Sequence, residues 1–329
     1  MTYKIDKIDT GNISGQMLDE LFALDSAMAE KYGFLKRIRN AGELKESYSA
    51  IFASEDNELF VIKNDEISCG ILTFLKAADW NGNLQYKLYI RLSGAPNQHL
   101  VADLEQFANE KISKYGQIAI ITYNNELPQL IEKYAAKVHL NANAYTLSKS
   151  DINTHLLDET IAGLGAKNAD LNMVYTDIIS EEYIERYCDL FMKAAEDMTD
   201  EQEEAYVRYI ITPEIQRRQN ENGAKRGQIH HCYMVFDGDI MAAKTNLSVN
   251  KNDSRFPYQF MVAVSREYRG RGLGKWLYAH MYKMLFETTD FEKVLIMHHP
   301  KNKAIIDISL WAGYKFAYSE VTHLVEFKA

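Results

Sequence analysis

The hydrophobic pattern of the chain changes its period once between residues 258 and 286. Residues 260–264 form an uninterrupted apolar run with β-branched members, which is typical of a strand buried on both faces. From Leu273 onward the apolar positions recur three and four residues apart, which predicts one face of an α-helix. That face consists of Leu273, Trp276, Leu277, His280, Met281, Met284 and Leu285. The pattern therefore predicts a strand and then a helix, joined by a short turn.

The same order of strands and helices occurs twice along the chain. The first copy predicts strands at 58–62, 67–74, 84–90 and 118–122, helices at 100–112 and 128–137, and a last strand near residue 145. The second predicts strands at 233–236, 240–249, 259–264 and 294–297, helices at 273–286 and 302–312, and a last strand at 323–327. Val61 and Val235 are 174 positions apart, and so are Gln85 and Gln259. Agreement of this kind predicts an internal duplication.

The length of 329 residues fits two domains. We expect a first mixed α/β domain at 1–150, a linker at 151–170 that carries two glycines, and a second domain at 171–329. The second domain also opens with a helical pattern at about 181–195. Strands that alternate with helices favour an α/β fold class.

The turn between the strand and the helix combines glycines with basic residues. Gly270, Gly272 and Gly274 allow a tight bend and a close approach of a ligand to the main chain. The first turn of the following helix has unpaired N–H groups and the positive end of the helix dipole. Arg269, Arg271 and Lys275 add charge. This combination favours a phosphate or diphosphate site.

Spacing excludes two common phosphate loops. A Walker loop has four residues between its first Gly and a Gly-Lys pair that Ser or Thr follows, whereas three residues lie between Gly270 and Gly274, and Trp276 follows Lys275. A Rossmann turn reads G-x-G-x-x-G at the start of a βαβ unit, and this one reads G-x-G-x-G near the end of the chain. A turn that only connects a strand to a helix is the alternative without a ligand.

The stretch Arg269 to Gly274 resembles the acyl-CoA turn of the GCN5-related N-acetyltransferases (GNAT), in which Arg or Gln is followed by two residues, Gly, one residue, and Gly or Ala. The resemblance implies two tandem GNAT-like domains, each a mixed, mostly antiparallel sheet flanked by helices. It also implies acetyl-CoA as cosubstrate, with its pantetheine arm along the strand and its diphosphate on the turn. The residues expected to bind it are Met261, Val262, Ala263, Val264, Arg269, Gly270, Arg271, Gly272, Leu273, Gly274, Lys275 and Asn302. Asn302 is included because the family opens its next helix with an Asn that contacts CoA.

The first copy lacks the features of this turn. Its corresponding stretch, 93–99, has one glycine, no Lys or Arg, and Pro96, which has no amide donor. We therefore expect only the second copy to bind CoA. A degenerate first copy beside a complete second one resembles the arrangement in mycothiol synthase.

Three residues are candidates for catalysis. Glu196 and Asp197 open an acidic segment that ends at Glu204; such runs are usually solvated, but in the resembled family this segment lies over the acceptor, so either carboxylate is a candidate base. Ser309 stands where the family usually has a Tyr that protonates the leaving thiolate. An alcohol is a poor proton donor, so Tyr314, a water molecule, or no acid at all are alternatives.

The adjacent His298 and His299 suggest a metal site, a cap or packing role, or a general base. Neighbouring residues on a strand point to opposite faces, so a shared metal ion is disfavoured and we expect none. His230 and His231 give a still weaker signal.

Net charge, cysteine content and the length of the apolar runs disfavour several classes of protein. A net charge of −9 disfavours nonspecific binding to nucleic acid or membranes. Cys69, Cys188 and Cys232 are widely spaced and form no zinc pattern or disulfide framework. No apolar run approaches 18 residues and the N-terminus shows no signal peptide, so we expect a cytoplasmic protein.

The expected activity is N-acetyl transfer from acetyl-CoA to a primary amine of a small molecule, by direct attack in a ternary complex. No Ser or Cys lies in a nucleophile pattern, which disfavours an acyl-enzyme. The acidic segment slightly favours a cationic acceptor. A catalytically weak acyl-CoA sensor or interaction module is the alternative, and both a monomer that mimics a dimer and a homodimer are compatible with the sequence.

Overall fold

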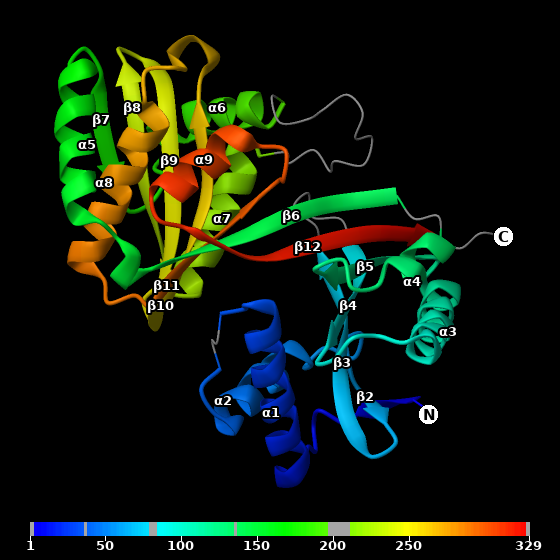
Figure 1. Ribbon diagram of the computed structural model, residues 1–329. Helices are drawn as coiled ribbons and strands as arrows, with labels where there is room; N and C mark the ends of the chain where they lie inside the picture. Colours follow the sequence, from blue (N-terminus) through cyan, green and yellow to red (C-terminus); the bar gives the residue numbers. More distant parts are fainter. Residues whose placement is uncertain (1–2, 36–37, 79–83, 135–136, 197–210, 327–329) are drawn as a thin grey trace. The chain divides into compact units, whose positions relative to one another are not determined.

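The computed structural model describes residues 3–35, 38–78, 84–134, 137–196 and 211–326, and the chain forms two compact units (Figure 1). Among the described residues, unit 1 comprises those up to Ala142 together with those from Ala317 onward, and unit 2 comprises those from Asn143 to Phe316. Within the described residues, no helix is both long and apolar enough to cross a membrane.

Unit 1 is a sheet with helices on it. Its elements are β1 (Tyr3–Ile8), α1 (Gly15–Tyr32), α2 (Ala41–Ile51), β2 (Glu58–Asn64), β3 (Ile67–Ala78), β4 (Leu84–Leu92), α3 (Gln98–Tyr115), β5 (Gln117–Tyr123) and α4 (Pro128–Lys133). The strand order is β1-β2-β3-β4-β5, followed by a segment of the last strand of the chain. Neighbouring strands are antiparallel except β4 and β5, which are parallel. The strands predicted at 58–62 and 67–74 lie within β2 and β3, which pair antiparallel as a hairpin.

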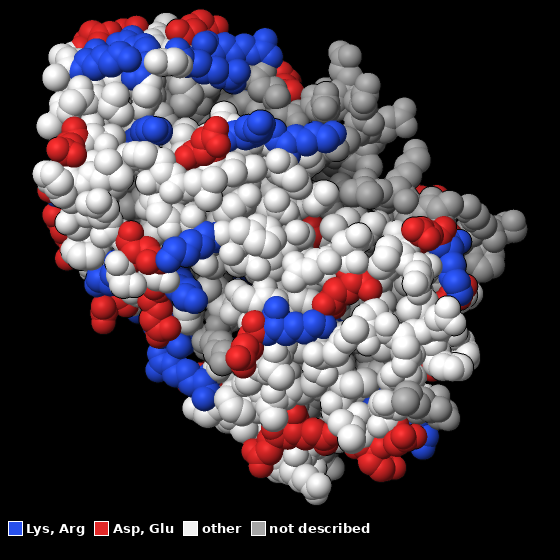
Figure 2. Space-filling view, viewed as in Figure 1, with Lys and Arg blue, Asp and Glu red and all other residues white. Residues whose placement is uncertain are grey.

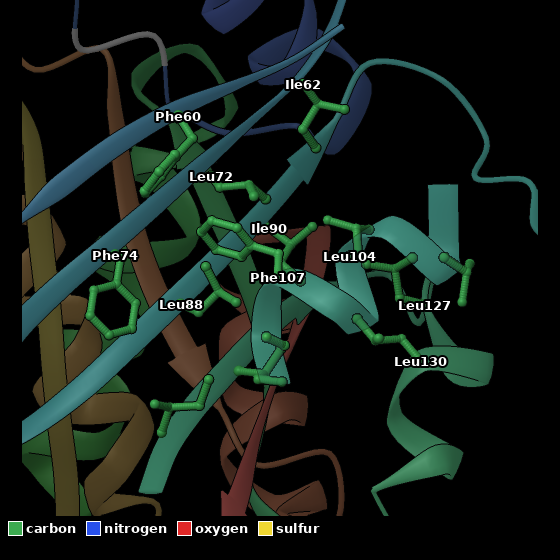
Figure 3. Packing of buried hydrophobic residues seen from close by; sticks show 14 of the residues in the cluster. Phe60, Ile62, Leu72, Phe74, Leu88, Ile90, Leu104, Phe107, Leu127 and Leu130 are labelled. Atoms are coloured by element: carbon green, nitrogen blue, oxygen red, sulfur yellow. The ribbon is translucent and has the colours of Figure 1, made fainter. Parts of the chain in front are cut away.

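One face of this sheet is covered by α3 and α4. Figure 3 shows Leu104 and Phe107 of α3 directed at Phe60, Leu72 and Leu88 on the strands. All of these side chains are buried. Alternate strand residues point to this face and form the core of the unit.

Unit 2 repeats this plan. Its elements are β6 (Lys137–Ser148, of which 143–148 belong to this unit), the 3₁₀ turn η1 (Lys149–Asp151), α5 (Thr154–Lys167), β7 (Asn172–Thr176), α6 (Ile184–Glu196), α7 (Pro213–Lys225), β8 (Gln228–Asp237), β9 (Ile240–Asn250), β10 (Asp253–Val264), the 3₁₀ turn η2 (Arg266–Tyr268), α8 (Leu273–Thr288), β11 (Lys293–His298) and α9 (Lys303–Trp311). The strand order is β6-β11-β10-β9-β8-β7, antiparallel except for the parallel pair β10 and β11. The predicted mixed, mostly antiparallel sheet flanked by helices is confirmed.

Both faces of this sheet are buried. Val235, Ala243 and Leu247 point toward α8, while Cys232 and Met234 point toward α6. This explains why β9 reads as a nearly continuous buried run. The segment expected to be a linker contains α5, which packs on α8. The two glycines lower the helix propensity of this segment, so the sequence did not predict α5. Asn153 caps the helix by accepting a hydrogen bond from the Leu156 amide.

Each unit is completed by a strand from the other copy. The last strand, β12 (Lys315–Glu326), belongs to unit 1 from Ala317 onward and pairs with β5 from Glu320 to Glu326. In unit 2, residues 143–148 pair with β11. The units are therefore not two consecutive stretches of the chain.

A chain that ends at Phe316 is expected to lose the stability of unit 1. It lacks the strand that pairs with β5, and it lacks Val325, which is part of the core of that unit. An unpaired, apolar edge strand favours aggregation. Hydrogen exchange of the β5 amides 118–122 should become fast in this chain and stay slow in a control chain that ends at Glu326. Slow exchange in both chains would show that β5 does not depend on β12.

Candidate acyl-CoA site

The turn between β10 and α8 is built on two glycines in the left-handed region. Gly270 has φ of 78° and Gly272 has φ of 85°. Residues with a Cβ atom lose about 1–2 kcal/mol in this conformation, so the backbone path depends on glycine. Gly272 is the N-cap of α8 and has no side chain with which to cap the helix. The main-chain amides of the first turn of α8 consequently have no side-chain cap.

The turn is also tightly packed. A Cβ atom on Gly272 would lie 2.8 Å from Leu164 Cδ2 of α5, and one on Gly274 would lie 2.8 Å from Ile308 Cδ1 of α9. Glycine is required at position 272 by both conformation and space. At position 274 only space requires it, because that residue is helical.

In the corresponding helix of the first copy, one amide of the first turn is already bound by a side-chain cap. The N-cap of α3 is Asn97, whose side-chain oxygen accepts a hydrogen bond from the Leu100 amide at 3.0 Å. The preceding residue is Pro96. This helix start offers an anion fewer donors than the start of α8, which agrees with the expectation that the first copy does not bind CoA.

The basic side chains at the turn have partners within unit 2. Arg271 donates to Asn168 and Asp170, Arg269 Nε donates to the Val264 carbonyl at 3.3 Å, and Lys275 Nζ lies 5.2 Å from the centre of the Trp311 ring. Figure 2 shows basic side chains gathered over the end of unit 2 that carries the turn between β10 and α8, with acidic ones between them.

The parallel strands β10 and β11 pair over a short distance. Within the described residues, the register between them is recorded at Tyr258 and Leu295. β10 continues to Val264 and has an irregularity between Gln259 and Val262 on its β9 side. The predicted pantetheine-binding strand, 261–264, therefore lies beyond the residue recorded as paired with β11. It stays paired with β9, and η2 separates it from the glycine turn.

Asn302 lies at the start of α9, as predicted. It is the N-cap, and its side-chain oxygen accepts a hydrogen bond from the Ile305 amide at 3.4 Å. Gly313 follows the helix with φ of 99°, a conformation common where helices end. A contact between Asn302 and CoA stays a prediction.

Ser309 is fully buried, and its hydroxyl forms a hydrogen bond at 2.8 Å with His298 Nε2. Burial lowers the pKa of His298 to about 4, so this imidazole is neutral at pH 7. The pair joins α9 to the end of β11 and gives His298 a packing role. Within the described residues, no group of His, Cys, Asp and Glu is arranged to hold a metal ion.

Of the two acidic candidates for the base, only Glu196 belongs to the described residues. Glu196 is exposed at the end of α6. Asp197 lies outside the described residues, as does the rest of the acidic segment up to Glu204. Their role as a base stays a prediction.

Sequence reasoning missed Lys244, the most unusual charge in unit 2. Its side chain is fully buried on β9, and its Nζ has no hydrogen-bond partner within the described part of the chain. The Nζ lies 3.6 Å from the centre of the Tyr187 ring and 4.8 Å from that of Phe191. Burial lowers its pKa from 10.5 to about 7. Its position as the one charge in the predicted strand 240–249 was the available signal.

A second missed feature is a buried hydrogen-bond network on the α8 face. Gln259 donates to Thr245 at 2.9 Å, and Tyr282 donates to Gln259 at 3.2 Å and lies 2.7 Å from the Tyr314 hydroxyl. Burial raises the pKa of Tyr314 well above its usual value, so this phenol stays protonated at neutral pH. The network fixes β10 just before its irregularity.

Comparison with known proteins agrees with this geometry. Residues 189–307 match the model of the acetyltransferase (GNAT) family. A tandem GNAT protein from the clavulanic acid biosynthesis pathway superposes with a TM-score of 0.59 at 14% identity, covering 98% of both chains. A GCN5-related N-acetyltransferase from Sphaerobacter thermophilus gives 0.60 at 12% identity, covering 99% of this chain and 96% of that one. A search of the curated proteins finds no match.

The two units thus define a protein built from two copies of an acetyltransferase-type fold, with one glycine turn suited to a phosphate. Residues 189–307 match the GNAT family model, and the chain as a whole has the fold of tandem GNAT proteins. These comparisons support an acyl-CoA-dependent acetyltransferase in general.

Proposed function

We propose that this protein transfers an acetyl group from acetyl-CoA to a primary amine of a small molecule. The observation that carries the proposal is the start of α8, where amides without a side-chain cap follow a strand that extends beyond its pairing with β11. The amides suit the diphosphate, and the strand 261–264 suits the amide-rich pantetheine arm, which can pair with it as an added strand.

The chemistry needs few side chains. The acceptor ammonium loses a proton to a base, for which Glu196 and Asp197 are the candidates, and the free amine attacks the thioester carbonyl. Main-chain N–H groups of β10 stabilise the negative oxygen that forms. The C–S bond then breaks as the attacking nitrogen loses its second proton, and the departing thiolate, with a solution pKa of about 8.5, takes up a proton.

We propose a cationic small molecule as the acceptor, because the acidic segment that follows α6 would attract it. Attraction of this kind acts mainly on the association rate and weakens with salt. The apparent KM for a diamine should therefore rise with ionic strength more than that for a monoamine.

The activity is tested by incubating the purified chain with acetyl-CoA and a panel of amines and measuring the free thiol that is released. We expect thiol release that depends on one class of amine, together with an acetylated amine detected by mass spectrometry. Release of thiol without an amine, or an acetylated Ser or Cys on the chain, would contradict direct attack.

The burial of Ser309 favours a second candidate, an acyl-CoA sensor without turnover. Its hydroxyl is held by His298 and stands in place of the usual acidic Tyr. Thermal unfolding separates the two candidates from other nucleotide enzymes. Saturating acetyl-CoA at about 100 times its Kd should add roughly 2.7 kcal/mol to the free energy of unfolding, whereas ATP and NAD should add little. Stabilisation by acetyl-CoA without thiol release would favour the sensor.

A further inference from the structure

Residues at and just after the end of α5 form hydrogen bonds with the glycine turn. Asn168 is fully buried, and it contacts Arg271 twice: its Nδ2 donates to the Arg271 carbonyl at 3.4 Å, and its Oδ1 accepts from Arg271 Nε at 2.9 Å. The same Nδ2 donates to the Leu164 carbonyl at 2.9 Å. A single buried amide therefore links the end of α5 to both the main chain and the side chain of one turn residue.

Asp170 also binds the Arg271 side chain. Its two carboxylate oxygens accept hydrogen bonds from Arg271 NH2 at 2.6 and 2.9 Å. The hydrogen bond from Arg271 lowers the pKa of the Asp170 carboxyl, so it is ionised at neutral pH. Charge-assisted hydrogen bonds of this length are among the stronger ones in proteins. Next to them, Leu164 fills the space beside Gly272.

We propose that Asn168 and Asp170 are positioning residues for the acyl-CoA site, and that Arg271 serves as the anchor of the turn and not as a ligand of the diphosphate. The inference rests on the proposed function. It assigns the role of preorganising the turn to residues at the C-terminal end of α5, a segment that precedes the first strand of the second copy.

An anchoring role for Asp170 and a purely electrostatic one predict opposite changes in acetyl-CoA affinity when its charge is removed. Removing a carboxylate close to a diphosphate site reduces repulsion and frees Arg271 for the phosphates, so a purely electrostatic role predicts tighter binding. An anchoring role predicts weaker binding, because the amides of residues 271–275 lose their fixed arrangement before the ligand arrives.

The test compares Asp170→Asn with the wild-type chain. We expect the Kd for acetyl-CoA, measured by titration calorimetry, to rise by about two- to fivefold, the loss expected when an ion pair with a largely exposed carboxylate is removed. The KM for acetyl-CoA should rise in parallel, with kcat at saturation unchanged. Acetyl-pantetheine, which lacks the diphosphate, should show no change in KM.

Asp158→Asn is the matched control. Asp158 lies on α5 and pairs with Lys283 of α8. Asp158→Asn therefore also removes one negative charge, but it changes no contact with the glycine turn. Arg271→Gln and the double variant complete a cycle, in which the double variant should bind no more weakly than Arg271→Gln alone.

Folding is checked separately, by circular dichroism and by hydrogen exchange of residues 271–275 in the ligand-free chain. Faster exchange of these amides in Asp170→Asn, with an unchanged global unfolding temperature, supports the anchor. Unchanged or tighter acetyl-CoA binding in Asp170→Asn overturns it. A wild-type chain that does not bind acetyl-CoA overturns the proposed function itself.

Discussion

Lys244→Met is expected to stabilise the protein at neutral and acidic pH. Lys244 is fully buried on β9, with aromatic rings of Tyr187 and Phe191 and the thiols of Cys188 and Cys232 around it. An ammonium group in such surroundings lacks the hydration that it has in the unfolded chain. Cation–π contact offsets about 2 kcal/mol of this loss.

The pH dependence follows from the pKa of Lys244, which burial lowers from 10.5 to about 7. Between these two values the unfolded chain holds a proton that the folded chain lacks, so stability rises with pH. The slope is up to about 1.4 kcal/mol per pH unit, and the full difference is up to about 5 kcal/mol. The destabilisation is complete below pH 7 and fades above it.

Urea unfolding between pH 6 and 8.5 measures this effect through the fluorescence of Trp276 and Trp311, which lie in unit 2. Over this range we expect the stability of unit 2 to rise with pH in the wild type, once pH exceeds 7, and the rise to be absent in Lys244→Met. The variant should be more stable by several kcal/mol at pH 6.5.

Lys193→Met is the control for this comparison. Lys193 is exposed on α6 and pairs with Asp189 four residues earlier, an arrangement that contributes a few tenths of a kcal/mol. It should change neither the stability nor its pH dependence by much. If Lys244→Met were less stable than the wild type at pH 6.5, the ammonium would have to be paired by a group that the described residues do not include.

Gly272→Val should weaken acetyl-CoA binding by roughly five- to 150-fold, because a β-branched residue in the left-handed region costs of the order of 1–3 kcal/mol and each 1.4 kcal/mol is a factor of ten. The turn is expected to relax by moving residue 272 out of this region, which redirects the amides of the first turn of α8. The added side chain also meets Leu164, which prevents the turn from keeping its path. Calorimetric titration with acetyl-CoA measures the loss.

Two variants separate strain from site geometry. Gly238 has φ of 54° in the turn between β8 and β9, with nothing within 4 Å of an added Cβ, so Gly238→Val has the same kind of strain away from the site. It should lower the unfolding temperature and leave the Kd unchanged. Leu164→Ala added to Gly272→Val makes room for the side chain but leaves the strained φ. If it restored wild-type binding, space and not conformation would explain the glycine.

The sequence predicted the order of the elements in each copy and the chemistry of the turn. The apolar run at 260–264 and the recurrence of apolar residues three and four positions apart at 273–285 are local patterns, since they follow from strand and helix geometry alone. The glycines at 270 and 272 are likewise local, because a backbone conformation requires them. These features could therefore be predicted from the sequence without knowledge of the tertiary contacts between elements.

Elements with weak local signals were missed. β1 is a six-residue strand in which half of the residues are exposed and none is fully buried, and α5 contains Gly163 and Gly165. What fixes them is contact with other elements: β1 pairs with β2, and α5 packs on α8. Burial against a partner outweighs propensity in such cases.

The sequence by itself determined the duplicated mixed fold and the one copy that has a glycine turn. Only the tertiary structure decided that Arg271 is held by Asn168 and Asp170, that Ser309 is bound by His298, and that Lys244 lies buried without a described partner. The reason is physical. Backbone conformation is set by neighbours along the chain, whereas the partner and the pKa of a charged group are set by residues that folding brings from far away in the sequence.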